Sequence, residues 1–89
     1  MTSYKIQDDV FLQKVVNETV ILAPESGNYF SLDEVGSRMI ELFRQTGSIE
    51  QTVAALVREY DAPQADIKRD LLALLEDMAQ QGVVEKIES

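Results

Sequence analysis

Apolar positions along this chain change from strand-like to helical spacing just after residue 32. The stretch Asn28 to Leu32 contains the strand formers Tyr29 and Phe30, and Gly27 precedes it as a turn residue. Asp33 is placed to cap a helix whose apolar positions follow at helical spacing, at Val35, Met39, Leu42 and Phe43. Since no loop separates strand from helix, the strand's register and the helix's packing are coupled. We expect an open sheet edge at this strand.

Two earlier strands are predicted, over Val10–Val16 and Thr19–Ala23, with a tight hairpin at Asn17-Glu18 between them. The run from Val20 to Leu22 lacks polar alternation. That run indicates a central strand covered on both faces, or a strand whose second face needs cover. A turn signal over residues 24–27 leads into the third strand, so the three strands form an antiparallel meander.

The rest of the chain is predicted to be helical. Ser48 and Gln51 form a capping box that starts a second helix, which ends at Tyr60. A third helix is predicted over residues 63–81, and residues 83–87 are expected to pack back as an extended segment. The sequence therefore predicts an α+β fold, in which a three-stranded antiparallel sheet is followed by three helices.

The third helix carries more apolar residues than one core-facing stripe requires. At about 100° per residue, a narrow stripe suffices to bury the helix, formed by Ile67, Leu71, Leu74 and Met78. A flank beside this stripe adds Lys68, Leu72, Leu75 and Ala79. The flank either widens the core contact of a small domain or forms one wall of a groove.

The length and composition set limits on organisation and location. The 89 residues suffice for one core but not for two. We therefore expect a flexible polar lead-in over residues 1–9 and a single domain over residues 10–89. No apolar run approaches the roughly 20 residues that span a bilayer, and the first residues lack the order of a signal peptide. A cytoplasmic location without membrane association is the expectation.

The net charge and the absence of two residue types argue against several classes of function. The net charge of -8 argues against nucleic acid as a partner, because phosphate binding depends on clustered Lys and Arg. The same charge favours neutral or basic partners, or simply keeps the protein in solution. The sequence has no His and no Cys, which removes the commonest general base, thiolate chemistry and the usual zinc ligands. We expect no catalytic residues, no metal and no cofactor.

A family resemblance extends from about Val10 to Val84. The residues that carry it are Leu32-Asp33, Gly36, Met39-Ile40, Leu42, Ser48-Ile49-Glu50, Leu56, Tyr60-Asp61, Asp70-Leu71, Leu74-Leu75, Met78 and Gly82-Val83-Val84. In this order and spacing they resemble the PqqD-like proteins, which are winged-helix-type recognition elements of ribosomally made peptide pathways. Each motif taken alone is mostly a pattern of hydrophobic positions, so the resemblance rests on the order and spacing of all of them together.

The resemblance implies a non-catalytic function. Such domains bind the leader segment of a precursor peptide and present it to a processing enzyme. The leader adds as a strand beside residues 28–32, in a groove whose other wall is the third helix. The implied site consists of Asn28, Tyr29, Phe30, Ser31, Leu32, Lys68, Leu72, Leu75 and Ala79. Lys68 would meet a leader carboxylate, and the register decides whether Tyr29 or Phe30 faces the groove.

The resemblance implies two kinds of partner enzyme. A leader peptidase of a lasso-peptide pathway is favoured, and a radical enzyme of the pyrroloquinoline-quinone pathway is the second option. A monomer or a weak dimer is expected, since an open strand edge can pair with itself.

Three other readings remain. A generic protein-interaction module needs no leader peptide. A DNA-binding winged helix needs a basic recognition helix, but the third helix has only two basic residues against the four acids Asp66, Asp70, Glu76 and Asp77. An acyl-carrier protein would use Ser31 for attachment, but the residues before Ser31 are predicted to be strands rather than a helix.

Overall fold

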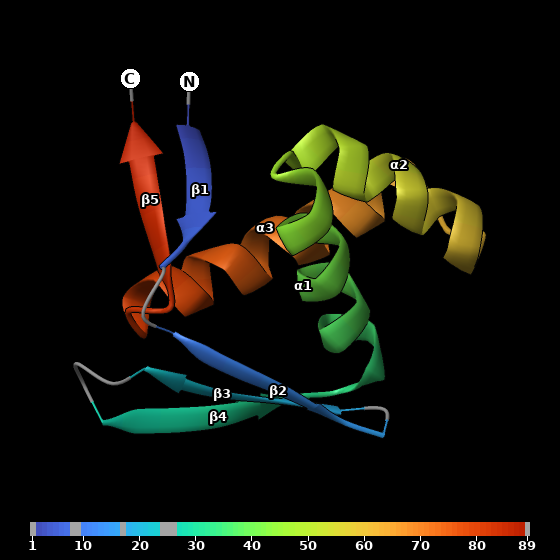
Figure 1. Cartoon of the computed structure of the whole chain (residues 1–89). Coiled ribbons are helices and arrows are strands. Elements are labelled where there is room, and N and C mark those ends of the chain that lie inside the picture. Colours follow the sequence, from blue (N-terminus) through green and yellow to red (C-terminus); the bar gives the residue numbers. More distant parts are fainter. Residues whose placement is uncertain (1, 8–9, 17, 24–26, 89) are drawn as a thin grey trace.

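Two antiparallel sheets and three helices make up the structure, a computed structural model (Figure 1). It describes residues 2–7, 10–16, 18–23 and 27–88, with the backbone alone at residues 2 and 28. The elements in this part of the chain are β1 (Thr2–Ile6), β2 (Phe11–Val15), β3 (Glu18–Ala23), β4 (Asn28–Leu32), α1 (Glu34–Thr46), α2 (Ile49–Tyr60), α3 (Gln64–Gln80) and β5 (Val84–Glu88).

The predicted meander is confirmed as a three-stranded sheet in the order β2-β3-β4. Its pairing runs from Phe11 opposite Leu22 on one side of β3 to Thr19 opposite Leu32 on the other. The helices lie over one face of this sheet (Figure 1). The predicted α+β fold is therefore correct. Asn17 and residues 24–26, where two turns were predicted, lie outside the described residues.

Only one face of β3 is covered by the described part of the chain. Ile21 is fully buried, whereas Val20 and Leu22 are 36% and 40% exposed. Side chains alternate between the faces of a strand, so the apolar run from 20 to 22 supplies both faces. Of the two interpretations of this run, the structure supports the second: one face of β3 packs on the core, and the described residues do not cover the other face.

The junction of β4 and α1 forms as the sequence predicts. Asp33 has extended backbone angles, and its carboxylate accepts a hydrogen bond of 2.8 Å from the backbone N–H of Gly36. A Cβ on Gly36 would lie 3.2 Å from Asp33 Oδ1 and 3.4 Å from Leu32 Cβ, so the close approach there is to the cap itself. Val35 was expected with Met39 and Leu42 on the core-facing line of α1. Met39 and Leu42 are buried, whereas Val35, in the first turn of the helix, is 44% exposed.

The prediction of a flexible lead-in is wrong for residues 2–6, which form β1 and pair with β5. Tyr4 is buried, and its hydroxyl donates a 2.6 Å hydrogen bond to Glu76 Oε1 of α3. Lys86 Nζ also lies 2.6 Å from this oxygen. The partner strand lies at the other end of the chain, which local patterns do not reveal. Asp8 and Asp9 lie outside the described residues.

A series of ion pairs joins β2, α1 and α2 on the surface. Lys14 Nζ lies 2.8 Å from Glu41, and Arg38 lies 2.6 Å from Glu41 and 2.7 Å from Glu59. Hydrogen bonding from Lys14 holds the pKa of Glu41 below its usual range, and Arg38 does the same for Glu59. Because these groups are partly exposed, each pair adds little stability and mainly orients the elements.

α3 packs one face into the core. Leu71, Leu75 and Met78 have no exposed surface, and Ile67 is 6% exposed. Leu75 was expected on the flank of α3, and its burial corrects that expectation. No helix in the described part of the chain is long and apolar enough to cross a membrane.

We expect Leu75→Ala to lower the free energy of unfolding by about 2–5 kcal/mol, the usual cost of an unfilled cavity in a core. The neighbouring Leu72 is only half-buried, so Leu72→Ala should cost clearly less. Urea denaturation of both variants measures the difference. Equal losses would contradict the placement of Leu75 in the core and Leu72 at its margin.

We expect Glu76→Gln to lower the thermal unfolding midpoint at neutral pH. Hydrogen bonds from Lys86 and then Tyr4 lower the pKa of Glu76 in the folded state. The stabilisation is therefore present above the unfolded pKa and is lost as the pH falls through the folded pKa. The difference from wild type should shrink below about pH 4.

Thermal unfolding followed by circular dichroism across this pH range measures the difference in unfolding midpoint between variant and wild type. Glu85→Gln is the matched control, since Glu85 is exposed on β5 and forms no ion pair with a described residue. A deficit of Glu76→Gln that persists unchanged in acid would show that charge is not its source.

Candidate functional site

β4 has a free edge. In the described part of the chain it pairs with β3 on one side only. On an edge strand, alternate residues direct their backbone N–H and C=O groups away from the sheet, where another strand can bond to them. The open edge expected at residues 28–32 is therefore confirmed.

The other edge strand, β2, is protected. Its register sets Lys14 opposite Thr19, on the helix-facing side of the sheet. From there Lys14 reaches Glu41 of α1. An inward-pointing charge on an edge strand is a common device against unwanted strand pairing. The two edges therefore differ in their capacity to accept a partner strand.

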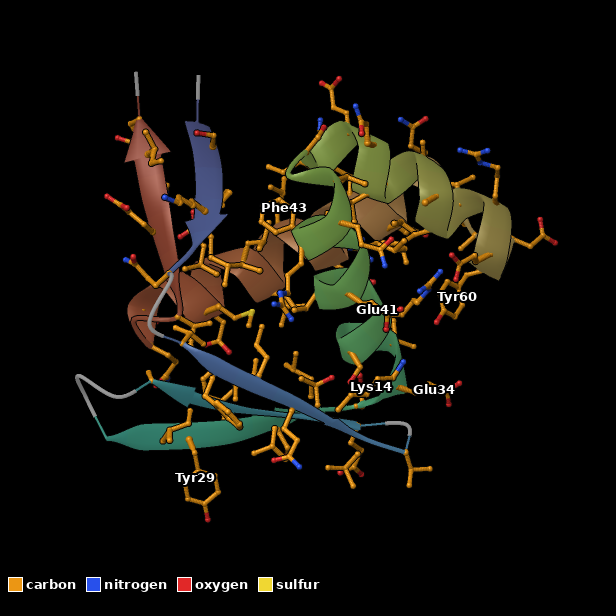
Figure 2. The ribbon with its side chains drawn as sticks, in the orientation of Figure 1. Lys14, Tyr29, Glu34, Glu41, Phe43 and Tyr60 are labelled. Carbon is orange, nitrogen blue, oxygen red and sulfur yellow. The ribbon has the colours of Figure 1, made fainter. Side chains whose placement is uncertain are left out.

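The register of β4 decides which aromatic residue faces the helices. Phe30 lies opposite the buried Ile21 and is half-buried, whereas Tyr29 lies opposite Leu22 and is 75% exposed. Figure 2 shows Tyr29 pointing away from the body of the protein. Phe30 and Leu32 therefore belong to the helix-facing side, and Tyr29 and Ser31 to the outer side.

A hollow of about 460 Å³ lies at the end of β4. Its lining comes from β4, the cap of α1, α3 and the start of β3, namely Ser31, Leu32, Asp33, Gly36, Leu74 and Glu18. Leu74 is half-buried and is the α3 side chain in this lining. The cap at Asp33 ends β4 and directs α1 away, which leaves the hollow beside the free edge.

The structure does not bring Lys68 and Leu72, two of the predicted α3 residues, to the hollow beside β4. Lys68 and Leu72 line a different hollow of about 530 Å³, with Tyr4, Phe43 and Ile49. By helical spacing Leu72 and Leu74 point about 160° apart, so this hollow lies on the opposite flank of α3. Ala79 is half-buried and shares the flank of Lys68 by the same spacing.

The hollow beside β4 therefore involves the flank of α3 opposite to the one named from the sequence, with Leu74 as its α3 residue. By helical spacing Asp70, Asp77 and Gln81 lie beside Leu74, so that flank is mostly polar, and the apolar spacing pointed to the flank of Leu72 instead. Leu74 was assigned to the core stripe, at whose margin it lies. Of the other expected site residues, Tyr29, Phe30, Ser31 and Leu32 lie on β4 as predicted, and the Asn28 side chain lies outside the described part.

The titratable groups with shifted pKa values belong to structural clusters. They are Tyr4, Glu76 and Lys86 on one side and Arg38, Glu41 and Glu59 on the other. None of these six lines the hollow beside β4. Among the described residues no group of three or more acidic side chains is arranged to hold a metal ion. What the edge and hollow offer is a surface for binding an extended chain.

Solved structures show the same fold. TbiB1 in complex with the TbiA(β) leader peptide is 34% identical and has a TM-score of 0.86, over 91% of this chain and 94% of that chain. The PqqD truncation of Methylobacterium extorquens PqqCD, a RiPP recognition element, is 28% identical with a TM-score of 0.73, over 93% and 88%. A lasso peptide synthetase B1 is 20% identical with a TM-score of 0.81, which shows the fold alone.

Curated relatives agree with this likeness. A PqqA binding protein of Rhodopseudomonas palustris is 35% identical over 71% of this chain and 60% of its own length. A bifunctional coenzyme PQQ synthesis protein C/D of Methylorubrum extorquens is 34% identical over 82% of this chain but only 19% of its own length. The family model for coenzyme PQQ synthesis protein D (PqqD) matches residues 18–84, from the first residue of β3 to the first of β5. A match of that extent, on the fold described above, establishes that this chain belongs to the PqqD family.

Proposed function

We propose that this chain binds the leader segment of a ribosomally made precursor peptide, without catalysis, and holds it for a maturation enzyme. The observation that carries the proposal is the free edge of β4 beside the hollow that Leu74 lines. Two similarities support it. A relative at 35% identity is named for binding PqqA, and a structure at 34% identity contains a leader peptide.

The leader adds to β4 as a further strand. β4 has five residues and spans about 16 Å, so it pairs with roughly five residues of an extended peptide. Backbone hydrogen bonds supply much of the affinity, and alternate side chains supply selection. Leader side chains on the helix-facing side come next to Phe30 and Leu32 and enter the hollow against Leu74. Those on the outer side come next to Tyr29 and Ser31.

The groove wall in this proposal differs from the one expected from the sequence. Leu74 takes the place of Leu72 and Leu75, because Leu75 has no exposed surface and Leu72 lies on the far flank of α3. Lys68 lies on that far flank too, so a leader carboxylate is not paired by Lys68. Apolar contact with Leu32 and Leu74, beside Glu18 and Asp33 that also line the hollow, together with backbone bonding at β4, carries recognition.

The maturation enzyme is proposed to be a leader peptidase of a lasso-peptide pathway, in the cytoplasm where precursors are made. Delivery of a leader is supported by TbiB1, which matches at a TM-score of 0.86 and holds a leader peptide. The choice of a lasso-peptide pathway rests on the family resemblance of the sequence. A radical enzyme of pyrroloquinoline-quinone synthesis is the second option, supported by the PqqA binding relative. The peptide that binds distinguishes the two.

We expect saturable binding of a leader peptide, with the TbiA(β) leader, PqqA and the precursor encoded beside this chain as probes. Amide NMR shifts should concentrate on residues 28–32 and around Leu74. Leu74→Asp should weaken binding by at least about tenfold, because it places a charge in an apolar contact. Isothermal titration measures the affinity, and the preferred probe indicates the pathway.

Leu72→Asp is the matched control, since Leu72 is also half-buried on α3 but lies on the opposite flank. It should bind as wild type does. Loss of binding in Leu72→Asp with no effect in Leu74→Asp would move the peptide to the other flank. Absence of binding to all three probes would remove the leader-recognition function.

A further inference from the structure

Exposed apolar side chains gather on the outer face of the three-stranded sheet. The register assigns to this face the residues Phe11, Gln13, Val15, Glu18, Val20, Leu22, Tyr29 and Ser31. Five of them are among the nine large apolar residues that are exposed in the described part of the chain. No helix or strand in that part covers this face (Figure 1).

Three of these side chains form one row across the sheet. Phe11 and Tyr29 each lie directly opposite Leu22, from β2 and β4 respectively. Phe11 is 60% exposed, Tyr29 is 75% exposed and Leu22 is 40% exposed. Directly opposed side chains lie about 5 Å apart, so the row is a continuous apolar strip. Contiguous apolar surface of this kind is uncommon on a monomer unless another molecule binds there.

The charge on this face is low for so acidic a protein. The chain has a net charge of -8, yet Glu18 is the single charged member of the face, at the end of β3. Gln13 and Ser31 are neutral. A surface complementary to this face would therefore be apolar and uncharged, and would bind through burial of apolar surface and through shape. A second copy of this chain would bring two charges of -8 together, which opposes self-association.

We propose that the outer face docks the maturation enzyme through an apolar, uncharged patch on that enzyme, an inference that rests on the proposed function. The face is continuous with the edge at which the leader adds, because Tyr29 and Ser31 belong to β4. A leader strand paired with β4 extends the same sheet, and its outward side chains join the same face. An enzyme seated on the face contacts this chain and the bound peptide together.

Leu22→Lys tests the proposal in the full chain, with the leader and the maturation enzyme encoded beside it as probes. We expect Leu22→Lys to bind the leader as wild type does, measured by fluorescence anisotropy. We expect its affinity for the enzyme, measured by titration in the presence of leader, to fall by at least about tenfold. Ile87→Lys is the control, because Ile87 is a strand residue of similar exposure, 42%, on β5 outside this face.

The outcomes separate this proposal from the leader-binding function. Wild type that fails to bind leader overturns the proposed function, and the docking proposal falls with it. Leu22→Lys that retains full enzyme affinity overturns the docking proposal alone, as does an equal loss in Ile87→Lys. Sedimentation that shows a wild-type dimer dissociated by Leu22→Lys assigns the face to a second copy and overturns it too. If Leu22→Lys does not fold, Phe11→Lys on β2 serves in the same assays.

Discussion

β4 continues directly into α1 without a loop, and the arrangement of the sheet depends on this constraint. Asp33 caps α1 through the backbone N–H of Gly36, and the absence of a Cβ at Gly36 lets Leu32 pack against the cap. Leu32 is thereby buried on the helix-facing side. Because side chains alternate, a buried Leu32 places Phe30 inside and Tyr29 outside. A slip of one residue would reverse both faces of β4 and leave the helix cap unmade.

The same register gives the sheet two different surfaces. On the helix-facing side, the end of β4, the cap and Leu74 of α3 leave a hollow beside a free strand edge. On the outer side, Leu22 brings Phe11 and Tyr29 into one exposed row. Neither surface requires a catalytic group. Both follow from where the strands of this sheet place alternate side chains, and in our proposals both hold other chains.

Much of the fold follows from the sequence because its causes are local. Period-two and helical spacing, the cap at Asp33 and the capping box at Ser48 are each read from a few neighbouring residues. β1 pairs with β5 from the opposite end of the chain, so the residues next to Tyr4 in the sequence do not identify Glu76 as its hydrogen-bond partner. For α3, the apolar flank of the helical wheel holds Leu72, and only packing against other elements decides that Leu75 is buried and that Leu74, beside Asp70 and Asp77, lines the hollow.

The two edges of the sheet differ in a way that would direct the proposed strand addition to one side. β2 and β4 are both edge strands, yet only β2 points a lysine inward, where Glu41 pairs with it and in turn with Arg38 in an ion-pair series. A strand arriving at β2 would have to displace that series or leave its charges poorly solvated, and both cost free energy. A strand arriving at β4 meets the apolar Phe30, Leu32 and Leu74 instead. Selection between the edges therefore depends on what lies beside each strand, since both offer the same unpaired backbone groups.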